Sequence, residues 1–192
     1  MNKITIPIGP QHPLLKEPLT LNIDISGEQV LGGVLRLGYV HRGIERLAQT
    51  RNYTQNVPLI ERVCGICSHI HTTTYCRAVE ILLGLEVPER AHYIRALMCE
   101  LERIHSHLLW LGILAKHIGL EMVFMHTWHD RELVLDLMEE LSGGRVAHAV
   151  NNIGGVRFDL DDEHRPMIAS TVDKLHRQYE QLLDILEHPD LG

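Results

Sequence analysis

Apolar and polar residues alternate over the first part of the chain. The segment 2–8 (NKITIPI) alternates between polar and apolar residues, as an edge strand would. The segments 19–25 (LTLNIDI) and 30–38 (VLGGVLRLG) also read as strands. Gly27, in the turn SGEQ between the last two segments, can adopt the positive φ that tight hairpin turns require. The pattern therefore predicts a small antiparallel sheet within residues 1–42.

Beyond residue 42 the apolar positions recur every three or four residues, which is the spacing of one helix face. The longest stretch of this kind is predicted to begin at about Pro88, because proline suits the first turn of a helix. Its apolar positions are Ile94, Leu97, Met98, Leu101, Ile104, Leu108, Leu111 and Leu114. This helix is expected to pack one continuous face against its neighbours.

Shorter helices are predicted on both sides of it. Residues 72–83 (TTTYCRAVEILL) are followed by Gly84, a frequent C-terminal cap. Asp130 is predicted to cap the start of a helix over 130–141. A last amphipathic helix is predicted to begin near Pro166.

These elements predict an α+β fold that is mostly helical. A sheet segment over residues 1–42 is followed by a helical segment over residues 43–192, which forms a bundle of long helices. Because the apolar stripe of each helix needs a partner, we expect the chain to form a single domain that is incomplete by itself. Self-association would then cover the remaining apolar faces.

Composition and charge narrow the function classes. The formal net charge of −7 and the aromatic content of 5% argue against a nucleic-acid partner, which requires a basic surface or stacking platforms. The longest apolar run, 108–115, is too short to span a bilayer, and the N-terminus lacks the apolar segment of an export signal. With four cysteines in 192 residues, we expect a reducing, cytoplasmic compartment rather than a disulfide framework.

Three of the four cysteines fall in the stretch ERVCGICSHIHTTTYC, residues 61–76. A C-x-x-C pair such as Cys64 and Cys67 serves zinc sites, iron–sulfur clusters, redox disulfides and hydrogenase metal sites. Zinc would need two further ligands, for which His69 and His71 are candidates. A redox pair should follow a buried strand, and no such strand precedes Cys64. Metal binding, redox chemistry and a structural role therefore all remain open from spacing alone.

The wider sequence resembles a known family. Residues 62–71 (RVCGICSHIH) fit the R-x-C-G-x-C-x-x-x-H signature of the large subunits of nickel–iron hydrogenases. The blocks GPQHP, LGYVHRGIERL, VPERAHYIRALMCELERIHSHLL and SGGRVAHAVNNIGGVR resemble the energy-converting, group 4 membrane-bound hydrogenases. This family is homologous to the 49-kDa subunit of complex I. The likeness covers essentially the whole chain.

The resemblance implies roles for individual residues. Cys64 is expected to be a terminal nickel ligand, and Cys67 to bridge nickel and an iron that carries carbonyl and cyanide ligands. His71 resembles the histidine that hydrogen-bonds the bridging sulfur. Arg62 is expected to orient the site through its positive charge. Glu17 falls where the family places a glutamate that relays protons from the nickel-bound thiolate.

The sequence departs from this family in one respect. The family's second cysteine pair, D-P-C-x-x-C, is not found in these 192 residues. We therefore expect the N-terminal half of a large subunit, truncated or encoded as a split gene, with no complete metal site in this chain alone. The isolated chain is expected to be inactive. Its implied partners are the C-terminal half, an iron–sulfur small subunit and membrane subunits, at the inner face of the cell membrane.

Three functions follow from the resemblance. The first is a hydrogenase that oxidises H2 or reduces protons reversibly, coupled to ferredoxin and to membrane ion translocation. The second is a complex I-like NADH-quinone oxidoreductase subunit with a quinone site, but that family lacks the C-x-x-C pair. The third is a relative of sulfane reductases with a modified metal site, against which the presence of Cys64, Cys67 and His71 argues.

Other candidate residues are expected to have structural roles. Cys76 and Cys99 lie on apolar helical patterns and are expected to be buried, unreactive thiols. Glu100 and Glu102 lie close before Arg103 on one helix and are expected to form helix ion pairs with it.

Overall fold

The computed structural model describes residues 3–13, 15 and 17–187. The chain divides into two compact units, Met1–Arg46 and Leu47–Gly192. We therefore describe the two units separately.

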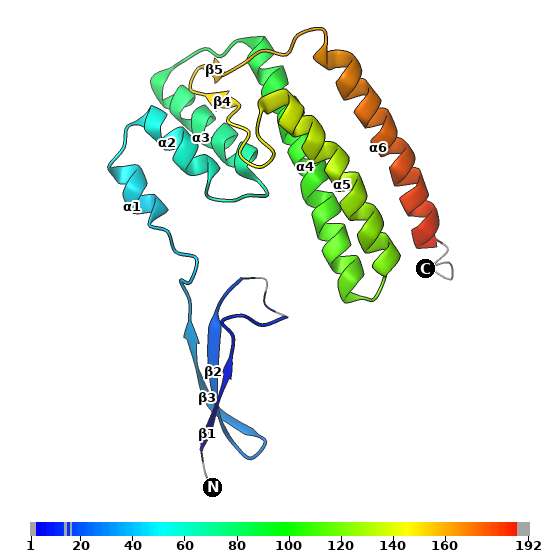
Figure 1. Ribbon diagram of the computed structural model, residues 1–192. Helices are drawn as coiled ribbons and strands as arrows, with labels where there is room; N and C mark the ends of the chain where they lie inside the picture. The colour runs from blue at the N-terminus through cyan, green and yellow to red at the C-terminus, as the bar shows by residue number, and fades with distance from the viewer. Residues whose placement is uncertain (1–2, 14, 16, 188–192) are drawn as a thin grey trace. The chain divides into compact units, whose positions relative to one another are not determined.

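The N-terminal unit is a three-stranded antiparallel sheet (Figure 1). Its strands are β1 (Ile4–Ile8), β2 (Thr20–Ser26) and β3 (Gln29–Arg36), in the order β1-β2-β3. Gly27, in the β2–β3 turn, has a φ of 63°, as the sequence predicted. Pro7 pairs with Asn22 on the edge strand, where a missing N–H is tolerated. The sheet predicted from alternation is thus confirmed.

One face of this sheet is aliphatic. Residues paired across antiparallel strands point to the same side, and three pairs between β1 and β2 consist of aliphatic residues only: Ile4–Ile25, Ile6–Ile23 and Ile8–Leu21. On the other face, Thr5 pairs with Asp24 and donates a hydrogen bond of 2.6 Å to its carboxylate. The alternation therefore separates one apolar face from one polar face.

The second unit is helical, with one short hairpin. Its elements are α1 (Ile44–Gln49, which the division of the units cuts), α2 (Tyr53–Glu61), α3 (Ser68–Leu83), α4 (Glu89–His117), α5 (Glu121–Ser142), β4 (Asn151–Asn152), β5 (Gly155–Val156) and α6 (His164–Glu187). Asn52 and Gln55 form a capping box at the start of α2. Gly84 ends α3 in the left-handed conformation, as predicted. Within the described residues, no helix is long and apolar enough to cross a membrane.

Two helix starts differ from the sequence prediction. Asp130 caps no helix, because α5 begins at Glu121 and Asp130 lies buried in its middle. The prediction was wrong because buried positions continue upstream of the aspartate, where Val123 and Thr127 are fully buried in α5. Helix α3 begins at Ser68 rather than at residue 72, so it starts directly after the C-x-x-C pair.

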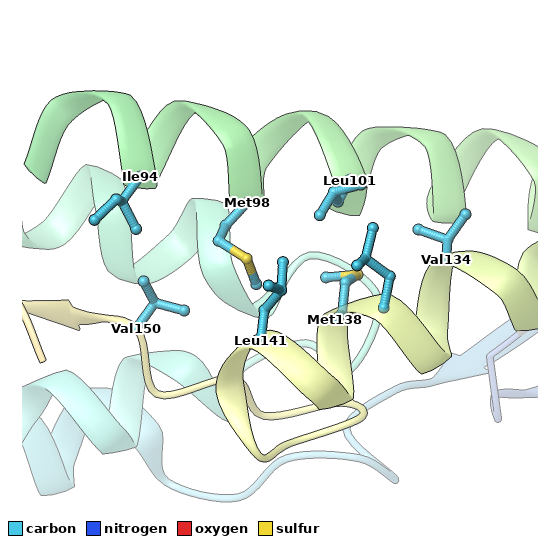
Figure 2. Close-up of a cluster of buried hydrophobic side chains, with 8 residues drawn as sticks. Ile94, Met98, Leu101, Val134, Met138, Leu141 and Val150 are labelled. Atoms are coloured by element: carbon cyan, nitrogen blue, oxygen red, sulfur yellow. The ribbon is translucent and has the colours of Figure 1, made fainter. Parts of the chain in front are cut away.

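The helices α4 and α5 enclose the core (Figure 2). Helix α6, orange to red in Figure 1, lies alongside them, and Met167, Ile168 and Leu175 pack against the core's edge. The buried side chains of this core are Ile94, Met98 and Leu101 of α4, Val134, Leu137, Met138 and Leu141 of α5, and Val150 from the following segment. The small sheet and the long-helix bundle confirm the predicted α+β, mostly helical fold class.

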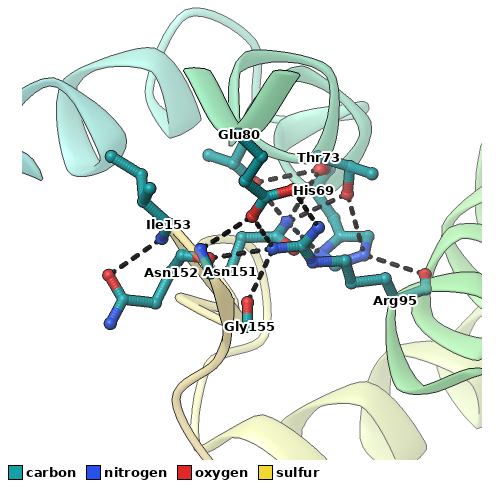
Figure 3. A network of polar contacts seen from close by, with 10 residues as sticks. His69, Thr73, Glu80, Arg95, Asn151, Asn152, Ile153 and Gly155 are labelled. Atoms are coloured by element: carbon teal, nitrogen blue, oxygen red, sulfur yellow. Dashed lines mark hydrogen bonds and ion pairs between the residues drawn. The ribbon is translucent and has the colours of Figure 1, made fainter. Parts of the chain in front are cut away.

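A buried ion pair between α3 and α4 binds the β4–β5 hairpin (Figure 3). Arg95 of α4 donates to both carboxylate oxygens of Glu80 on α3, at 3.0 and 2.7 Å. The same guanidinium donates to the backbone carbonyls of Asn152 and Gly155 at 2.9 and 2.7 Å. Gly154 in turn donates its N–H to Glu80 at 2.8 Å. The pair therefore joins α3, α4 and the β4–β5 hairpin, and both charges have partners.

Candidate metal centre

The C-x-x-C pair occupies the connection between α2 and α3. Helix α2 ends at Glu61, and Cys67 is the N-cap residue of α3. His71 lies one helical turn beyond Cys67, and its N–H bonds the Cys67 carbonyl at 3.3 Å. The ligand atoms of Cys64, Cys67 and His71 all lie within 4.8 Å of one another. A tight connection and a helix start therefore bring three metal-ligating side chains together.

These three side chains fit a transition metal. Two thiolates and one imidazole form a soft donor set that suits zinc, nickel or iron. All three residues are partly buried. In the part of the chain that the structure describes, this is the one group of three or more such side chains with converging ligand atoms. A metal held here would have room for ligands from outside the group.

The two thiols differ in their tendency to ionise. Burial disfavours the Cys64 thiolate, but hydrogen bonds from the Cys67 thiol and from the N–H of Ile66, 3.4 Å from Sγ, outweigh it and lower the pKa of Cys64. Burial raises the pKa of Cys67 to about 12, and its hydrogen bond to Cys64 and the Cys64 charge act in the same direction. Cys64 is therefore the thiol of the pair that ionises first, and a bound metal would need both residues as thiolates.

A buried carboxylate of α4, Glu102, binds the start of helix α3, directly after the C-x-x-C pair. Glu102 of α4 accepts hydrogen bonds from the N–H of His69 at 2.6 Å and of Ile70 at 2.9 Å. The Ser68 hydroxyl oxygen lies 3.4 Å from the same carboxylate. Its side chain is buried, and burial raises the pKa of the carboxyl in spite of these donors. Glu102 therefore caps the first turn of α3.

The predicted ion pair of Glu102 with Arg103 is wrong. Arg103 pairs with Glu100 at 3.0 Å, and both are exposed. Glu102 follows buried Met98 by four residues and precedes buried His105 by three, so it shares their helix face. That spacing is the signal that would have placed Glu102 on the buried side of α4.

The segment 144–151 covers the other side of the cysteine loop. The Ser68 hydroxyl donates to the Val146 carbonyl at 2.7 Å, and a Cβ at Gly65 would lie 3.5 Å from a Val146 methyl. Ala149 has a φ of 49° and donates its N–H to Glu61 at 2.5 Å. A carboxylate therefore holds a backbone conformation that is unusual for alanine.

His69, a possible zinc ligand from spacing, points away from the cysteines. Its ring contacts the Arg95 carbonyl at 3.1 Å and the Asn151 amide at 3.2 Å, within the network of Figure 3. Burial lowers the pKa of His69 to about 4, so the ring is neutral at pH 7. It therefore joins α3, α4 and β4 rather than binding metal.

The remaining candidate residues lie outside this group of three metal-ligating side chains, in both units of the chain. Arg62 is largely exposed and donates to the Pro58 carbonyl at 2.9 Å and to Glu61 at 3.3 Å. Glu17 lies exposed in the N-terminal unit, so its role as a proton relay stays a prediction. The predicted burial is complete for Cys76, whereas Cys99 is partly exposed.

Comparison with known proteins relates this geometry to a family. Residues 42–116 match the family model of nickel-dependent hydrogenases, and residues 117–190 match that of the 49 Kd subunit of respiratory-chain NADH dehydrogenase. The membrane-bound hydrogenase subunit alpha of Pyrococcus furiosus is 44% identical over 185 residues, which are 96% of this chain and 43% of that protein. The chain belongs to the family shared by hydrogenase large subunits and complex I 49-kDa subunits.

Other members of this hydrogenase and 49-kDa family are similar over the same region. An NADH-quinone oxidoreductase subunit of Campylobacter jejuni is 41% identical over 186 residues, covering 95% of this chain and 46% of that protein. A solved structure of the membrane-bound sulfane sulfur reductase, an archaeal respiratory membrane complex, superposes with a TM-score of 0.82 at 30% identity, covering 95% of this chain and 49% of that chain. The chain thus spans less than half the length of these relatives.

Proposed function

We propose that this chain is the N-terminal part of the catalytic subunit of a membrane-bound nickel–iron hydrogenase. The observation that supports the proposal is the convergence of Cys64, Cys67 and His71 within 4.8 Å. The nickel-dependent hydrogenase family model covers this group. A quinone-site subunit of the 49-kDa type has no need of two thiols placed in this way.

In this proposal the chain supplies half of the ligand set. Cys64 and Cys67 would supply two of the thiolates that hold a nickel–iron centre, whose iron would carry carbonyl and cyanide ligands. The other two thiolates come from a second C-x-x-C pair outside this chain. When bound, such a centre would supply the redox-active metal site for the reversible cleavage of H2. His71 donates a hydrogen bond to the Cys67 sulfur and fixes its orientation.

Two further residues handle charge and protons in the proposal. Glu17 would be the proton-relaying glutamate that the family has at this position. Arg62, anchored by the Pro58 carbonyl and by Glu61, adds positive charge beside the loop. These roles rest on the positions of the two residues in the family's motifs.

The assembly that we propose follows the relatives. The remaining half of the large subunit, an iron–sulfur small subunit and membrane subunits complete an oxidoreductase at the inner face of the cell membrane. Electrons pass to or from ferredoxin through the small subunit, and the complex couples this transfer to ion translocation. The chain by itself is inactive in this scheme, because it supplies only part of the metal centre.

One observation favours a second function. The solved structure that superposes on 95% of this chain comes from a sulfane sulfur reductase. In that alternative the assembled protein reduces sulfane sulfur at a modified metal site and evolves no H2. The complex I-like alternative would instead show quinone reductase activity that is independent of both cysteines.

Metal binding by the chain gives the first test. Cobalt(II) added to the reduced chain should produce a thiolate-to-cobalt charge-transfer band with one metal bound per chain. Cys64→Ser and Cys67→Ser should each abolish the band, and His71→Ala should weaken binding about tenfold. Cys99→Ser is the matched control and should bind as the wild type does. Binding that survives both Cys64→Ser and Cys67→Ser would refute the proposed site.

Activity of the assembled complex gives the second test. The complex with this chain should evolve H2 from reduced viologen, and Cys64→Ser should reduce the rate at least a thousandfold. Reduction of polysulfide without H2 evolution would support the sulfane reductase alternative. Quinone reduction that Cys64→Ser leaves unchanged would support the complex I-like alternative.

A further inference from the structure

We propose that Glu102 is a positioning residue for the metal centre: its carboxylate caps α3 in place of Cys67 and so leaves the Cys67 sulfur free for the metal. This inference rests on the proposed function, in which Cys64 and Cys67 bind metal. Glu102 is neither a ligand nor part of the cysteine motif. It acts on the site through the first turn of α3.

The argument begins with the cap position. The first N–H groups of a helix have no partner within it, and the N-cap side chain usually accepts one of them. Here the N-cap residue is Cys67, whose side chain accepts a cap hydrogen bond from none of the described residues. Sulfur is a weak acceptor, and a sulfur engaged in capping would be turned away from a metal. The site therefore needs another group to cap this helix.

Glu102 provides that group from a neighbouring helix. Its two carboxylate oxygens receive the N–H groups of His69 and Ile70, at 2.6 and 2.9 Å, one oxygen for each. These are the second and third residues of α3. Charge-assisted bonds of this length are about twice as strong as neutral ones. The backbone is thus held in place two and three residues after Cys67.

Glu102 is itself held in place by the core of the helical unit. Glu102 follows Leu101 and Met98 on α4, and both of these side chains are enclosed in the core (Figure 2). The Ser68 hydroxyl extends the contact to the Val146 carbonyl of the covering segment. Because packed cores tolerate little displacement, the α4–α5 core sets the position of Cys67 through Glu102.

The chemistry of the bond makes the inference specific to a carboxylate. A carboxylate accepts at both oxygens, so it satisfies both N–H groups at once. Glutamine has the same shape, but its NH2 end can only donate and would face one of the two N–H groups. Glu102→Gln therefore loses one bond and adds a donor–donor contact, with little change in volume. Glu102→Asp keeps both acceptors on a side chain shorter by one methylene.

The experiment compares two glutamates of the same helix. The cobalt(II) affinity of the chain should fall 10- to 100-fold in Glu102→Gln, the range typical of groups that orient metal ligands. Glu100→Gln is the matched control: Glu100 is exposed and pairs only with Arg103 among the described contacts, so its affinity should change less than twofold. Glu102→Asp should recover part of the lost affinity. A purely structural role would instead lower the melting temperature and leave the affinity and charge-transfer band of the folded chain unchanged.

The outcomes separate this inference from the proposed function. If the wild-type chain shows no thiolate–cobalt band, the proposed metal site is wrong. If the wild type binds through both cysteines and folded Glu102→Gln binds equally well, the role of Glu102 is refuted while the metal site stands. If Glu102→Gln does not fold, hydrogen exchange of the wild type decides. The His69 and Ile70 amides should be strongly protected, and exchange at the rate of free amides would overturn the inference.

Discussion

At the scale of single residues, burial controls which groups around the cysteine loop carry charge. His105 of α4 is buried, and its Nδ1 accepts a hydrogen bond of 2.9 Å from Arg131. Burial and then the Arg131 charge lower the pKa of His105 to about 4. The ring is therefore a neutral acceptor at pH 7, and its protonation would remove the bond from Arg131. His69 is neutral for the same main reason, burial.

This charge state predicts acid sensitivity. The pKa of His105 is about 4 in the folded chain and about 6.5 when unfolded, so the unfolded state binds the proton first. The contribution of neutral His105 to the free energy of unfolding is fully present above pH 6.5 and is lost as the pH falls from 6.5 to 4. At pH 5 the loss is about 2 kcal/mol. In His105→Gln, the fall in the free energy of unfolding between pH 7.5 and pH 5 should shrink by about this amount.

Urea denaturation at the two pH values measures the effect. His107→Gln is the matched control, because it makes the same substitution at an exposed position of the same helix. An equal pH dependence in His105→Gln and the wild type would show that His105 titrates normally.

At the scale of elements, the helices α4 and α5 cross closely at one glycine. A Cβ at Gly112 would lie 2.5 Å from the Thr127 hydroxyl oxygen and 3.0 Å from the Trp128 ring. Both of these neighbours belong to α5, and Thr127 is fully buried. Glycine at this position therefore sets how closely the two core helices approach.

Gly112→Ala should destabilise the chain, although alanine favours helix. In a free helix the change would stabilise by about 1 kcal/mol, but forcing a methyl group into this contact costs about 1–3 kcal/mol. We expect a lower melting temperature and a net loss of about 1 kcal/mol, measured by chemical denaturation. Ala96→Gly, at an exposed position of the same helix, measures the difference in helix propensity between alanine and glycine alone. A rise in stability in Gly112→Ala would show that the helices can move apart freely.

At the scale of the whole molecule, the aliphatic face of the N-terminal sheet is left accessible. Ile4, Ile6 and Val30 are 57%, 43% and 64% exposed, although all three are large aliphatic residues. A contiguous apolar face of this kind favours association. It also explains why the buried core clusters of the described residues all lie in the helical unit.

The isolated chain should therefore self-associate at high concentration. Sedimentation velocity should show a concentration-dependent shift from monomer to larger species, and Ile6→Lys should reduce it at least fivefold. Asn22→Lys places the same charge on the polar face of the same sheet and should have little effect. A monomer at every concentration, or equal effects of the two lysines, would contradict the role of this face.

The sequence alone determined the features that depend on neighbours along the chain. Strand-like segments between turn residues predicted the three strands, and apolar positions every three or four residues predicted the long helix from Glu89. Gly27 and Gly84 marked the turn and the helix end. The family motif also singled out Cys64, Cys67 and His71, because these residues are close in sequence. Each of these features depends on local backbone geometry, which short patterns specify.

Only the tertiary structure decided how side chains from distant segments pair. Glu102 and Glu100 look alike in sequence, yet one caps α3 from 33 residues away and the other lies at the surface. His69 and His71 are equally plausible ligands by spacing, but the packing of α3 against α4 turns His69 into the core. The capping potential of Asp130 was overridden because burial of the residues before it favours a continuous helix. In each case the deciding term is burial, which depends on what packs against the side chain and not on its neighbours in sequence.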